Sequence, residues 1–244
     1  MLWNVLASPL RTSKPRIPDG MRVYAVGDVH GRADLLEALL VRIDADLTAR
    51  PIAQQVQVFL GDYIDRGPNS REVLDLLIKR RRQHPMICLL GNHESIAVEF
   101  IKNPSVWPAW KAGGGLSTLL SYGVAIPIRS NPQELAVAFS QALADEHRRF
   151  LASLALSYTC GDFFFCHAGV RPKIPLRQQQ QADLLWIRDD FLLHEEDFGK
   201  IVVHGHTATN EPDVRPNRIN IDTGAYATGH LTCLVLEGDQ ISFL

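Results

Sequence analysis

The sequence predicts an α/β fold in which two mixed β-sheets are flanked by helices. In residues 21–102, short β-branched runs that end in Gly-Asp or Gly-Asn alternate with helical patterns, which favours parallel strands joined by crossover helices. The middle of the chain, about residues 102–154, is more helical. The second half holds a series of short strands, and these predict a second sheet packed on the first.

Three strand and helix pairs follow one another in the first part of the chain. The predicted strands are 23–26, 56–60 and 86–90, and they run into Gly27-Asp28, Gly61-Asp62 and Gly91-Asn92. After each strand, apolar residues recur at helical spacing, over 35–43, from about Ser70 and from about Glu94. This βαβαβα order is typical of a sheet with parallel strands.

Strand patterns return after residue 154. The predicted strands are 156–160, 163–166, 201–203, 219–221, 231–236 and 240–244, and the turn Glu237-Gly238-Asp239 joins the last two. Residues 11–20, by contrast, combine proline, glycine and charge without any periodicity. We therefore expect a flexible N-terminal extension over residues 1–20 and one domain over residues 21–244.

The composition is that of an ordinary globular protein, with 46% hydrophobic and 21% charged residues in a chain of 244. The 25 basic and 27 acidic residues give a net charge of −2, which offers no general attraction for nucleic acid or an anionic membrane. No stretch approaches the roughly 20 apolar residues of a membrane-spanning helix, and the start lacks the pattern of a signal peptide. We expect a cytoplasmic monomer with neither nucleic acid nor membrane as a partner.

Residues that can bind a metal follow five of the predicted strands. They are Asp28 and His30, Asp62, Asn92 and His93, His167, and His206. In open α/β sheets, functional groups collect beyond the carboxyl ends of the strands, so these side chains are expected to meet. A single histidine in such a position is more often structural, but five strand ends in a row indicate a site.

The ligand types indicate which metals fit this site. Carboxylate, amide oxygen and imidazole favour manganese, iron or zinc, while the four scattered cysteines lie in apolar runs and are expected to be buried thiols. There are more groups than one ion needs, which predicts two divalent ions sharing a carboxylate. Two such ions about 4 Å apart repel by roughly 17 kcal/mol at an effective dielectric constant of about 20, so an anionic group must lie between them.

The motifs at these strand ends form an ordered signature. They are G-D-V-H-G (27–31), G-D-Y-I-D-R-G (61–67), G-N-H-E (91–94), H-A-G (167–169) and G-H-T (205–207). Together they resemble the calcineurin-like metallophosphoesterases, and more narrowly the phosphoprotein phosphatase family, which includes eukaryotic and phage-lambda serine/threonine phosphatases. The resemblance implies a four-layer αββα sandwich and two divalent metal ions. Mn²⁺ is the expected metal, with iron or zinc as alternatives.

The same resemblance assigns the metal ligands. It places one ion on Asp28, His30 and Asp62, and the other on Asp62, Asn92, His167 and His206. The last motif departs from the wider superfamily, because many members carry G-H-x-H where this chain has Gly205-His206-Thr207-Ala208. The first ion therefore has one imidazole ligand fewer than in members with G-H-x-H, as the resemblance to the phosphoprotein phosphatase branch implies. His204 does not match the motif, so a structural role is expected for it.

Two arginines are predicted to bind the phosphate. Arg66 directly follows the metal-ligand loop, and Arg188 matches a phosphate-binding arginine of the family. Both would hold phosphate oxygens by bidentate hydrogen bonds. The alternative for Arg188 is a surface ion pair with neighbouring acidic residues. Arg171 is a weaker candidate.

His93 and Asp65 are predicted to form a catalytic pair. A carboxylate beside an imidazole raises its pKa and orients it, which makes His93 a candidate general acid. A serine or threonine alkoxide needs a proton to leave, whereas a nucleotide or polyphosphate leaves without one. Bacterial diadenosine tetraphosphate hydrolases of similar sequence have alanine at the place of Asp65 and usually G-N-H-D, whereas this chain has Asp65 and Glu94.

These features predict a dimetal phosphomonoester hydrolase. The expected enzyme is a serine/threonine protein phosphatase that uses a metal-bridging hydroxide, with a phosphoprotein as its partner. The alternative is a symmetrical diadenosine tetraphosphate hydrolase or another phosphodiesterase of the superfamily. A non-catalytic phosphate-binding module is disfavoured, because no ligand of the signature is missing.

Of three further features, the first two have an ordinary structural interpretation. The basic run at residues 79–82 ends a predicted helix, where cations favour the negative end of the helix dipole, so a solvated helix end is favoured over a nucleic-acid site. Trp107, Trp110 and Tyr122 are expected to pack within the helical insertion, with a peptide groove as the alternative. Tyr226 is a weak candidate for a substrate contact.

Overall fold

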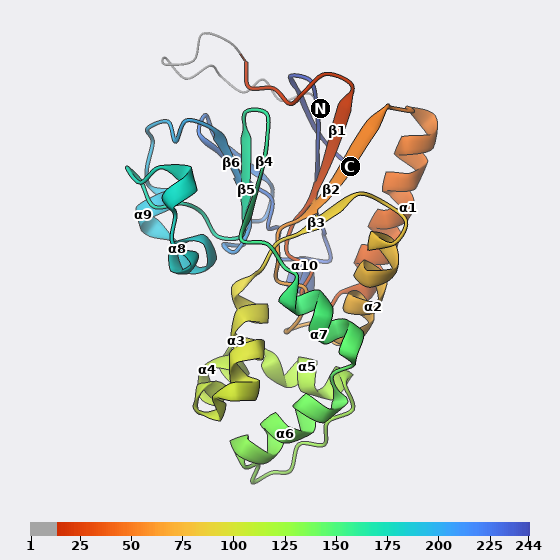
Figure 1. Ribbon diagram of the computed structural model, residues 1–244, viewed down its shortest axis with the longest axis vertical. Coiled ribbons are helices and arrows are strands. Elements are labelled where there is room, and N and C mark those ends of the chain that lie inside the picture. Colours follow the sequence, from red (N-terminus) through yellow and green to blue (C-terminus); the bar gives the residue numbers. More distant parts are fainter. Residues whose placement is uncertain (1–13) are drawn as a thin grey trace.

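The computed structural model describes residues 14–244, in which two five-stranded sheets pack face to face between layers of helices (Figure 1). Helices α1 (Ala33–Ala49) and α2 (Ser70–Arg81) lie beside the first sheet, and α8 (Gln181–Trp186) and α9 (Asp189–Leu192) beside the second. This is the four-layer αββα arrangement, so the predicted fold class is confirmed.

The first sheet has the strand order β10-β9-β1-β2-β3. Its strands are β1 (Met21–Val26), β2 (Gln54–Phe59), β3 (Met86–Cys88), β9 (Cys233–Glu237) and β10 (Gln240–Phe243). Strands β1, β2 and β3 are parallel, whereas β9 runs antiparallel to β1. The last two strands thus return to the first sheet instead of joining the second, and β9 alternates between the same two cores as β1.

The second sheet has the strand order β4-β5-β6-β8-β7. Its strands are β4 (Ser157–Cys160), β5 (Phe163–Cys166), β6 (Ile201–His204), β7 (Asp213–Val214) and β8 (Arg218–Asn220). The three central strands, β5, β6 and β8, are parallel, and antiparallel strands close both edges. The carboxyl ends of the three parallel strands therefore lie along one edge of this sheet.

Alternation along the strands builds three cores. In β1, Val23 and Ala25 face the second sheet, whereas Tyr24 and Val26 face the helices of the first sheet. Strand β5 alternates in the same way between the core that separates the sheets and a third cluster beneath α8 and α9. Because both faces of each sheet are apolar, each sheet must be covered on both sides, which dictates four layers.

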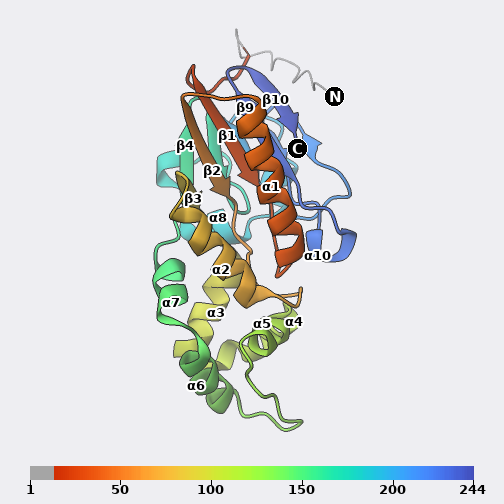
Figure 2. The same ribbon diagram turned by 90° about the vertical axis from the view of Figure 1, so that its right-hand side faces the viewer.

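A helical insertion, residues 102–154, extends beyond the carboxyl ends of the first-sheet strands (Figure 2). It follows α3 (Asn92–Lys102) and contains η1 (Pro104–Val106), α4 (Trp107–Ala112), α5 (Gly115–Ser121), α6 (Pro132–Ala142) and α7 (Asp145–Ala152). Helix α6 begins as the sequence dictates, with Pro132 in its first turn and Asn131 accepting the Gln133 N–H at 2.9 Å. The predicted helical character of this segment is confirmed.

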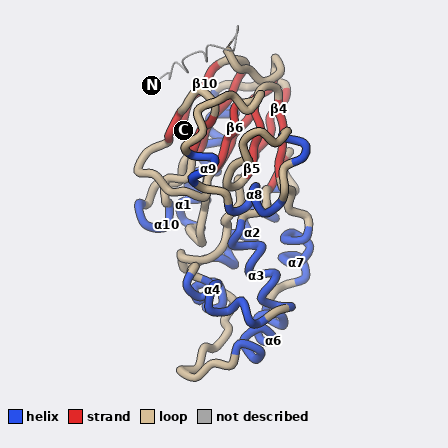
Figure 3. The backbone as a smooth tube through the Cα atoms, turned by 90° about the vertical axis from the view of Figure 1, so that its left-hand side faces the viewer, coloured by secondary structure: helices blue, strands red, loops and turns tan. Residues whose placement is uncertain are grey.

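The helices of the second sheet are short (Figure 3). Besides α8 and α9 they include η2 (Leu176–Gln178), and α10 (Ala225–Thr228) follows β8. Segments of three to six residues have no apolar periodicity to detect, which is why the sequence did not predict them.

Part of the predicted N-terminal extension is packed on the domain. Residues 1–13 lie outside the described residues. In the remainder, Ile17 is only 1% exposed, belongs to the core between the sheets and donates its N–H to the carbonyl of Gly238 at 3.0 Å. Residues near Ile17 therefore cover one end of the sandwich.

Several smaller expectations can be compared with the structure. The four cysteines are buried and free, as predicted. In the described part of the chain, every helix is too short or too polar to cross a membrane. The basic run ends α2, where Arg81 and Arg82 are exposed, as the expected solvated helix end requires, and Arg82 pairs with Glu146. Arg80 departs from this expectation, because it is buried and pairs with Asp44. Trp107 and Trp110 are buried in the insertion, so their packing role is the correct interpretation.

Candidate dimetal site

Site residues gather where the parallel strands of both sheets end. Each of these strands is followed within a few residues by polar side chains that are almost fully buried. They are Asp28 and His30 after β1, Asp62 after β2, Asn92 after β3, His167 after β5, His206 after β6 and Asp222 after β8. The structure thus brings together all six predicted metal-binding residues and adds a further acid.

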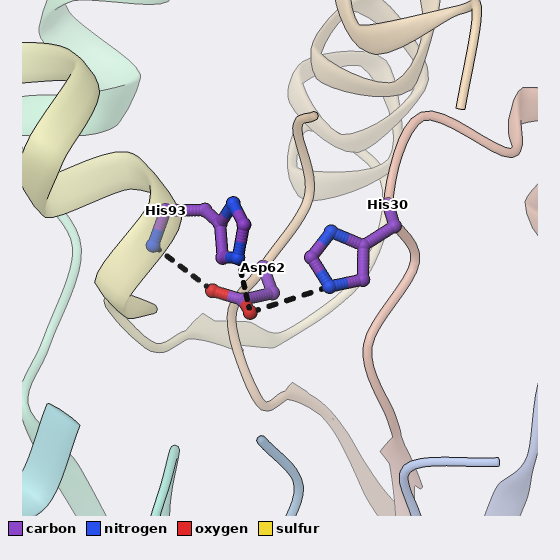
Figure 4. Close-up of side chains that lie close together, drawn as sticks. All are labelled: His30, Asp62 and His93. Atoms are coloured by element: carbon purple, nitrogen blue, oxygen red, sulfur yellow. Dashed lines mark hydrogen bonds and ion pairs between the residues drawn. The ribbon is translucent and has the colours of Figure 1, made fainter. Parts of the chain in front are cut away.

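A first group forms around one oxygen of Asp62. Figure 4 shows His30 and His93 on either side of the Asp62 carboxylate, with both rings directed at it. Nε2 of His30 lies 3.4 Å from Asp62 Oδ2, and Nε2 of His93 lies 3.7 Å from the same oxygen. These three buried side chains are close enough together to hold a metal ion.

A second group forms around the other oxygen of Asp62. Nε2 of His167 lies 3.4 Å from Asp62 Oδ1 and 2.8 Å from Asn92 Oδ1. Nδ1 of His206 lies 2.9 Å from the same Asn92 oxygen. Since each oxygen of Asp62 faces a different group, its carboxylate lies where a bridge between two cations is needed.

The hydrogen bonds of the imidazoles leave lone pairs directed into the site. A backbone carbonyl can only accept, so Nδ1 of His30 donates to Ile64 at 2.9 Å and Nδ1 of His167 donates to Leu60 at 3.0 Å. Each Nε2 is then an acceptor that faces acceptor oxygens of Asp62 or Asn92. Such contacts are unfavourable unless a cation lies between them.

Unpartnered buried atoms support the same conclusion. Asp28 Oδ1, His30 Nε2 and His206 Nε2 are buried without a hydrogen-bond partner, although buried polar atoms are normally satisfied. The other oxygen of Asp28 accepts the backbone N–H of His206 at 3.1 Å. Oxygen and nitrogen donors without thiolate match manganese, iron or zinc. The residues present therefore fit a pair of divalent cations.

Burial sets the charges of these groups. It lowers the pKa of His30 and of His206 to about 3 and also lowers that of His167, so all three are neutral at pH 7, the form that binds metals. Burial would raise the pKa of Asp62, but the surrounding imidazoles outweigh it and lower that pKa. Burial and neighbouring carboxylates raise the pKa of Asp28. Cations would relieve this repulsion between buried acids.

The backbone of the site is held in an unfavourable conformation. Six non-glycine residues among those described have positive φ, and five belong to the site: His30 (45°), Asp62 (51°), Asp65 (71°), Arg66 (65°) and His206 (67°). A left-handed residue with a side chain costs about 1–3 kcal/mol and persists only where its surroundings impose it. Such strain is typical of functional sites.

Glu94 and Gly91 impose the conformation of the Asp62 loop. The buried Glu94 carboxylate accepts backbone N–H groups from Tyr63 at 2.7 Å, Asp62 at 2.9 Å, Gly91 at 3.0 Å and Ile64 at 3.2 Å. It thereby ties the loop after β2 to the loop after β3. Gly91 is required because a Cβ there would lie 2.2 Å from Asp62 Oδ1.

His93 differs from the other imidazoles of the site. Its Nδ1 lies 2.7 Å from Asp65 Oδ2. Burial lowers the pKa of His93, but the carboxylates of Asp62 and Asp65 outweigh this and raise it to about 9. His93 is therefore protonated at pH 7, unlike His30 and His206. Although His93 lies in the first group, its protonated ring carries an N–H at Nε2 where His30 has a lone pair.

Arg66 lies over the first group. Its Nη2 is 3.4 Å from His93 Nε2, and its guanidinium carbon is 4.7 Å from the ring centre of Tyr226. Tyr226 also meets His30 edge to face, with ring centres 5.5 Å apart. The weak sequence candidate Tyr226 therefore does line the site, where it stacks on an arginine predicted to bind phosphate.

Arg188 lies beside the second group. Its Nη1 donates to Thr207 Oγ1 at 3.1 Å, next to His206. Arg171, by contrast, pairs with acids, with Asp190 at 3.1 Å and with Asp183 at 2.6 Å. Arg171 is thus tied to α8 and α9, whereas Arg188 is directed to the site.

A cavity of about 420 Å³ adjoins the second group. Trp186, which lines it, lies edge-on to His206 with ring centres 6.2 Å apart, and its side chain is 49% exposed. The cavity is lined by Leu90, Ser95, Ile96, Val98, Glu99, Leu151, Gln181 and Trp186.

Two buried polar residues need separate comment. Sequence reasoning missed Asp222, which is 2% exposed and whose pKa burial raises to about 6; it directly follows a strand pattern, the same signal that identified the six predicted metal-binding residues. His204 was expected to be structural. Its ring packs on Phe191 with centres 4.9 Å apart, and its Nδ1 donates to the Gly205 carbonyl at 3.1 Å.

A four-layer α/β sandwich with carboxylates and neutral imidazoles converging at its strand ends defines the class of metal-dependent phosphoesterases. The chain belongs to the calcineurin-like phosphoesterase family, whose model matches residues 21–233. The family resemblance expected from the motifs is confirmed.

Three proteins are similar to this chain over most of its length. A bis(5'-nucleosyl)-tetraphosphatase PrpE (asymmetrical) from Anoxybacillus flavithermus is 24% identical over 227 residues, which cover 86% of this chain and 88% of the relative. The structure of a candidate diadenosine tetraphosphatase matches with a TM-score of 0.62 at 21% identity, covering 95% and 98% of the two chains. A cold-active protein tyrosine phosphatase matches with a TM-score of 0.63 at 17% identity, covering 93% and 78%. The two structures establish the shared fold.

Proposed function

We propose that the protein hydrolyses phosphate monoesters of alcohols, with phosphorylated serine and threonine side chains of proteins as its substrate class. The observation that carries this proposal is the pair formed by His93 and Asp65. An alkoxide is a poor leaving group, so its departure needs a proton donor. A protonated imidazole fixed by a buried carboxylate supplies one.

We assign as metal ligands the residues whose buried nitrogen and oxygen lone pairs are directed into the site. Asp28, His30 and Asp62 would hold one divalent cation, and Asp62, Asn92, His167 and His206 would hold the other. Cations bound there would lower the pKa of a coordinated water and offset the charge of the phosphate. We propose Mn²⁺ as the metal, with iron or zinc as alternatives that the same donors accept.

Arg66 and Arg188 bind the phosphate oxygens in this account. They approach from the two sides of the site, Arg66 stacked on Tyr226 and Arg188 hydrogen-bonded to Thr207. Fixed guanidinium groups stabilise charge on the equatorial oxygens without reorganisation during the reaction.

His93 protonates the leaving oxygen. Its Nδ1 is occupied by Asp65, so Nε2 is the atom that gives up the proton. Nε2 of His93 lies 3.4 Å from Nη2 of Arg66 and 3.7 Å from Oδ2 of Asp62. The proton donor is therefore next to both the proposed phosphate-binding arginine and the proposed metal ligand. The imidazole then regains its proton from water, ready for another cycle.

A second candidate function is the asymmetrical cleavage of dinucleoside tetraphosphates. The relatives support it, because proteins 24–27% identical over most of both chains carry that name. The sequence alone suggested symmetrical cleavage as the alternative, and the names of the relatives favour the asymmetrical reaction. The cavity beside Trp186 is large enough for a nucleoside.

A substrate panel separates the two functions. The protein is stripped with a chelator and reloaded with Mn²⁺, and kcat/KM is measured for a phosphoserine peptide and for diadenosine tetraphosphate. We expect the peptide to be preferred by at least about tenfold, a difference of about 1.4 kcal/mol in transition-state binding. A preference for the dinucleotide, with ATP and AMP as products, would establish the second function instead. The Asp62→Asn variant, purified in parallel, controls for contaminating phosphatases.

A further inference from the structure

The helical insertion reaches the active site at Asp65. Three side chains donate hydrogen bonds to the Asp65 carboxylate: His93 and two residues of the insertion, Trp110 and Thr118. Trp110 Nε1 donates to Oδ2 at 2.8 Å, and Thr118 Oγ1 donates to Oδ1. Both oxygens of Asp65 are thus fixed from the insertion, and His93 shares Oδ2 with Trp110.

Thr118 holds the backbone of Asp65 as well as its side chain. Its Oγ1 accepts the Asp65 N–H at 2.9 Å and lies 3.0 Å from Ser70 Oγ, which accepts the same N–H at 3.0 Å. This cluster secures Asp65 in its left-handed conformation, with φ of 71°. The residue after Asp65 is held by the insertion too, because Arg66 donates its N–H to the Gly114 carbonyl at 3.3 Å.

Trp110 is tightly enclosed by other aromatic side chains. It is fully buried, and its ring contacts those of Phe100, Phe139 and Trp107, with centres 4.9, 5.4 and 5.8 Å apart. Two χ angles locked by aromatic packing leave the indole N–H only one direction, toward Asp65. The donor therefore provides a fixed reference point for the carboxylate.

We propose that the helical insertion serves to position the proton donor: Trp110 and Thr118 are positioning residues that fix the Asp65 carboxylate, and through it the orientation of the His93 imidazole toward the leaving oxygen. This inference rests on the role of His93 as general acid in the proposed function. It gives residues 102–154 a part in the reaction although none of them supplies a metal ligand.

The inference predicts a loss that depends on the leaving group. Without the Trp110 or Thr118 donor, His93 is oriented less well, so esters that need protonation suffer most. Trp110→Phe keeps an aromatic ring and removes the N–H, and Thr118→Val keeps the shape and removes the hydroxyl. We expect each to lower kcat on a phosphoserine peptide about tenfold and on 4-nitrophenyl phosphate less than about twofold, with KM unchanged.

Matched variants distinguish positioning from packing. Trp107→Phe alters the neighbouring indole of the same helix, which makes no contact with Asp65 among the hydrogen bonds of the described residues, and we expect both activities to stay within about twofold. Thr118→Ser restores the hydroxyl and should recover the peptide activity. Equal losses on the two substrates, a rise in KM alone, or no loss at all would each overturn the inference.

Asp65→Asn separates failure of this inference from failure of the proposed function. If Asp65→Asn loses peptide activity selectively while Trp110→Phe and Thr118→Val do not, the acid pair stands and the positioning role is wrong. If Asp65→Asn lowers both activities equally, His93 is not the general acid, and the proposed mechanism fails together with the inference.

A spectrum of the metal-free protein tests the contact without any assay. The chain has four tryptophans, so four indole N–H signals are expected from ¹⁵N-labelled protein. The signal that disappears in Trp110→Phe should be shifted downfield, exchange slowly with solvent and move in Asp65→Ala. An unshifted, rapidly exchanging Trp110 signal would contradict the hydrogen bond on which the inference depends.

Discussion

The strand-end edge and the helical insertion build two halves of the site in opposite ways. At the strand ends, buried acceptors face one another and several atoms have no partner, among them Asp28 Oδ1 and His30 Nε2. Around Asp65, every acceptor oxygen receives a donor from His93, Trp110 or Thr118. Acceptors without a donor indicate where cations would bind. A carboxylate whose two oxygens both receive donors indicates instead that the imidazole beside it, His93, is held in its protonated form.

The difference also separates two kinds of histidine. Burial keeps His30 and His206 neutral with pKa values of about 3, while the carboxylates beside His93 raise its pKa to about 9. All of these imidazoles lie within one small region, so their distances to Asp62 alone do not distinguish ligand from acid. What distinguishes them is the partner of the other ring nitrogen: a carbonyl for His30, a carboxylate for His93.

The largest effect is expected at the residue shared by the two metal groups. Asp62→Asn removes the negative charge between two cation positions, so we expect kcat/KM to fall at least about a thousandfold on every substrate, about 4 kcal/mol in transition-state stabilisation. Steady-state kinetics at saturating Mn²⁺ test this. Asp239→Asn, in the exposed turn between β9 and β10, is the matched control, and its kcat/KM should equal that of the unaltered protein. If Asp62→Asn retained its activity, the proposed role of the Asp62 carboxylate between two cations would be wrong.

Much of this arrangement was accessible from the sequence. Asp28, Asp62, Asn92, His167 and His206 each follow a strand pattern, and parallel strands in a sandwich bring their carboxyl ends together. The series of short strand patterns after residue 154 likewise predicts a second sheet packed on the first. The order of the motifs then identified the family.

Other parts could not be predicted, for physical reasons. The return of β9 to the first sheet depends on which partner strand remains unpaired, and a strand pattern carries no such information. The contact between Trp110 and Asp65 joins residues 45 positions apart through an irregular helical insertion. Helices as short as α9 and α10 depend on tertiary contacts instead of periodicity.

An intermediate effect is expected in the pH dependence of the acid pair. A general acid must be protonated, and the raised pKa of His93 keeps its proton to about pH 9, so kcat/KM on an alkyl phosphate should fall as pH rises through that value. Asp65→Asn removes a carboxylate that raises this pKa, so its falling limb should move to lower pH. Rate profiles from about pH 6 to about pH 10 measure both. If the alkaline fall in kcat/KM occurred at the same pH in Asp65→Asn, a group other than His93 would control it.

The smallest effect is expected at the phosphate-binding arginine of the second group. Arg188→Lys keeps the charge but loses the planar pair of donors, so we expect KM for phosphopeptide to rise about tenfold with a smaller change in kcat. Arg171→Lys is the control, because Arg171 is exposed and paired with acids of α8 and α9. A larger rise in KM for Arg171→Lys than for Arg188→Lys would reverse the assignment of the two arginines.

The most direct test of the account is anomalous diffraction from crystals of the chain soaked with Mn²⁺. The account predicts two manganese peaks about 3.5–4 Å apart, one on each side of the Asp62 carboxylate, with His93 outside both coordination shells. A lone peak, or a peak ligated by Nε2 of His93, would contradict it.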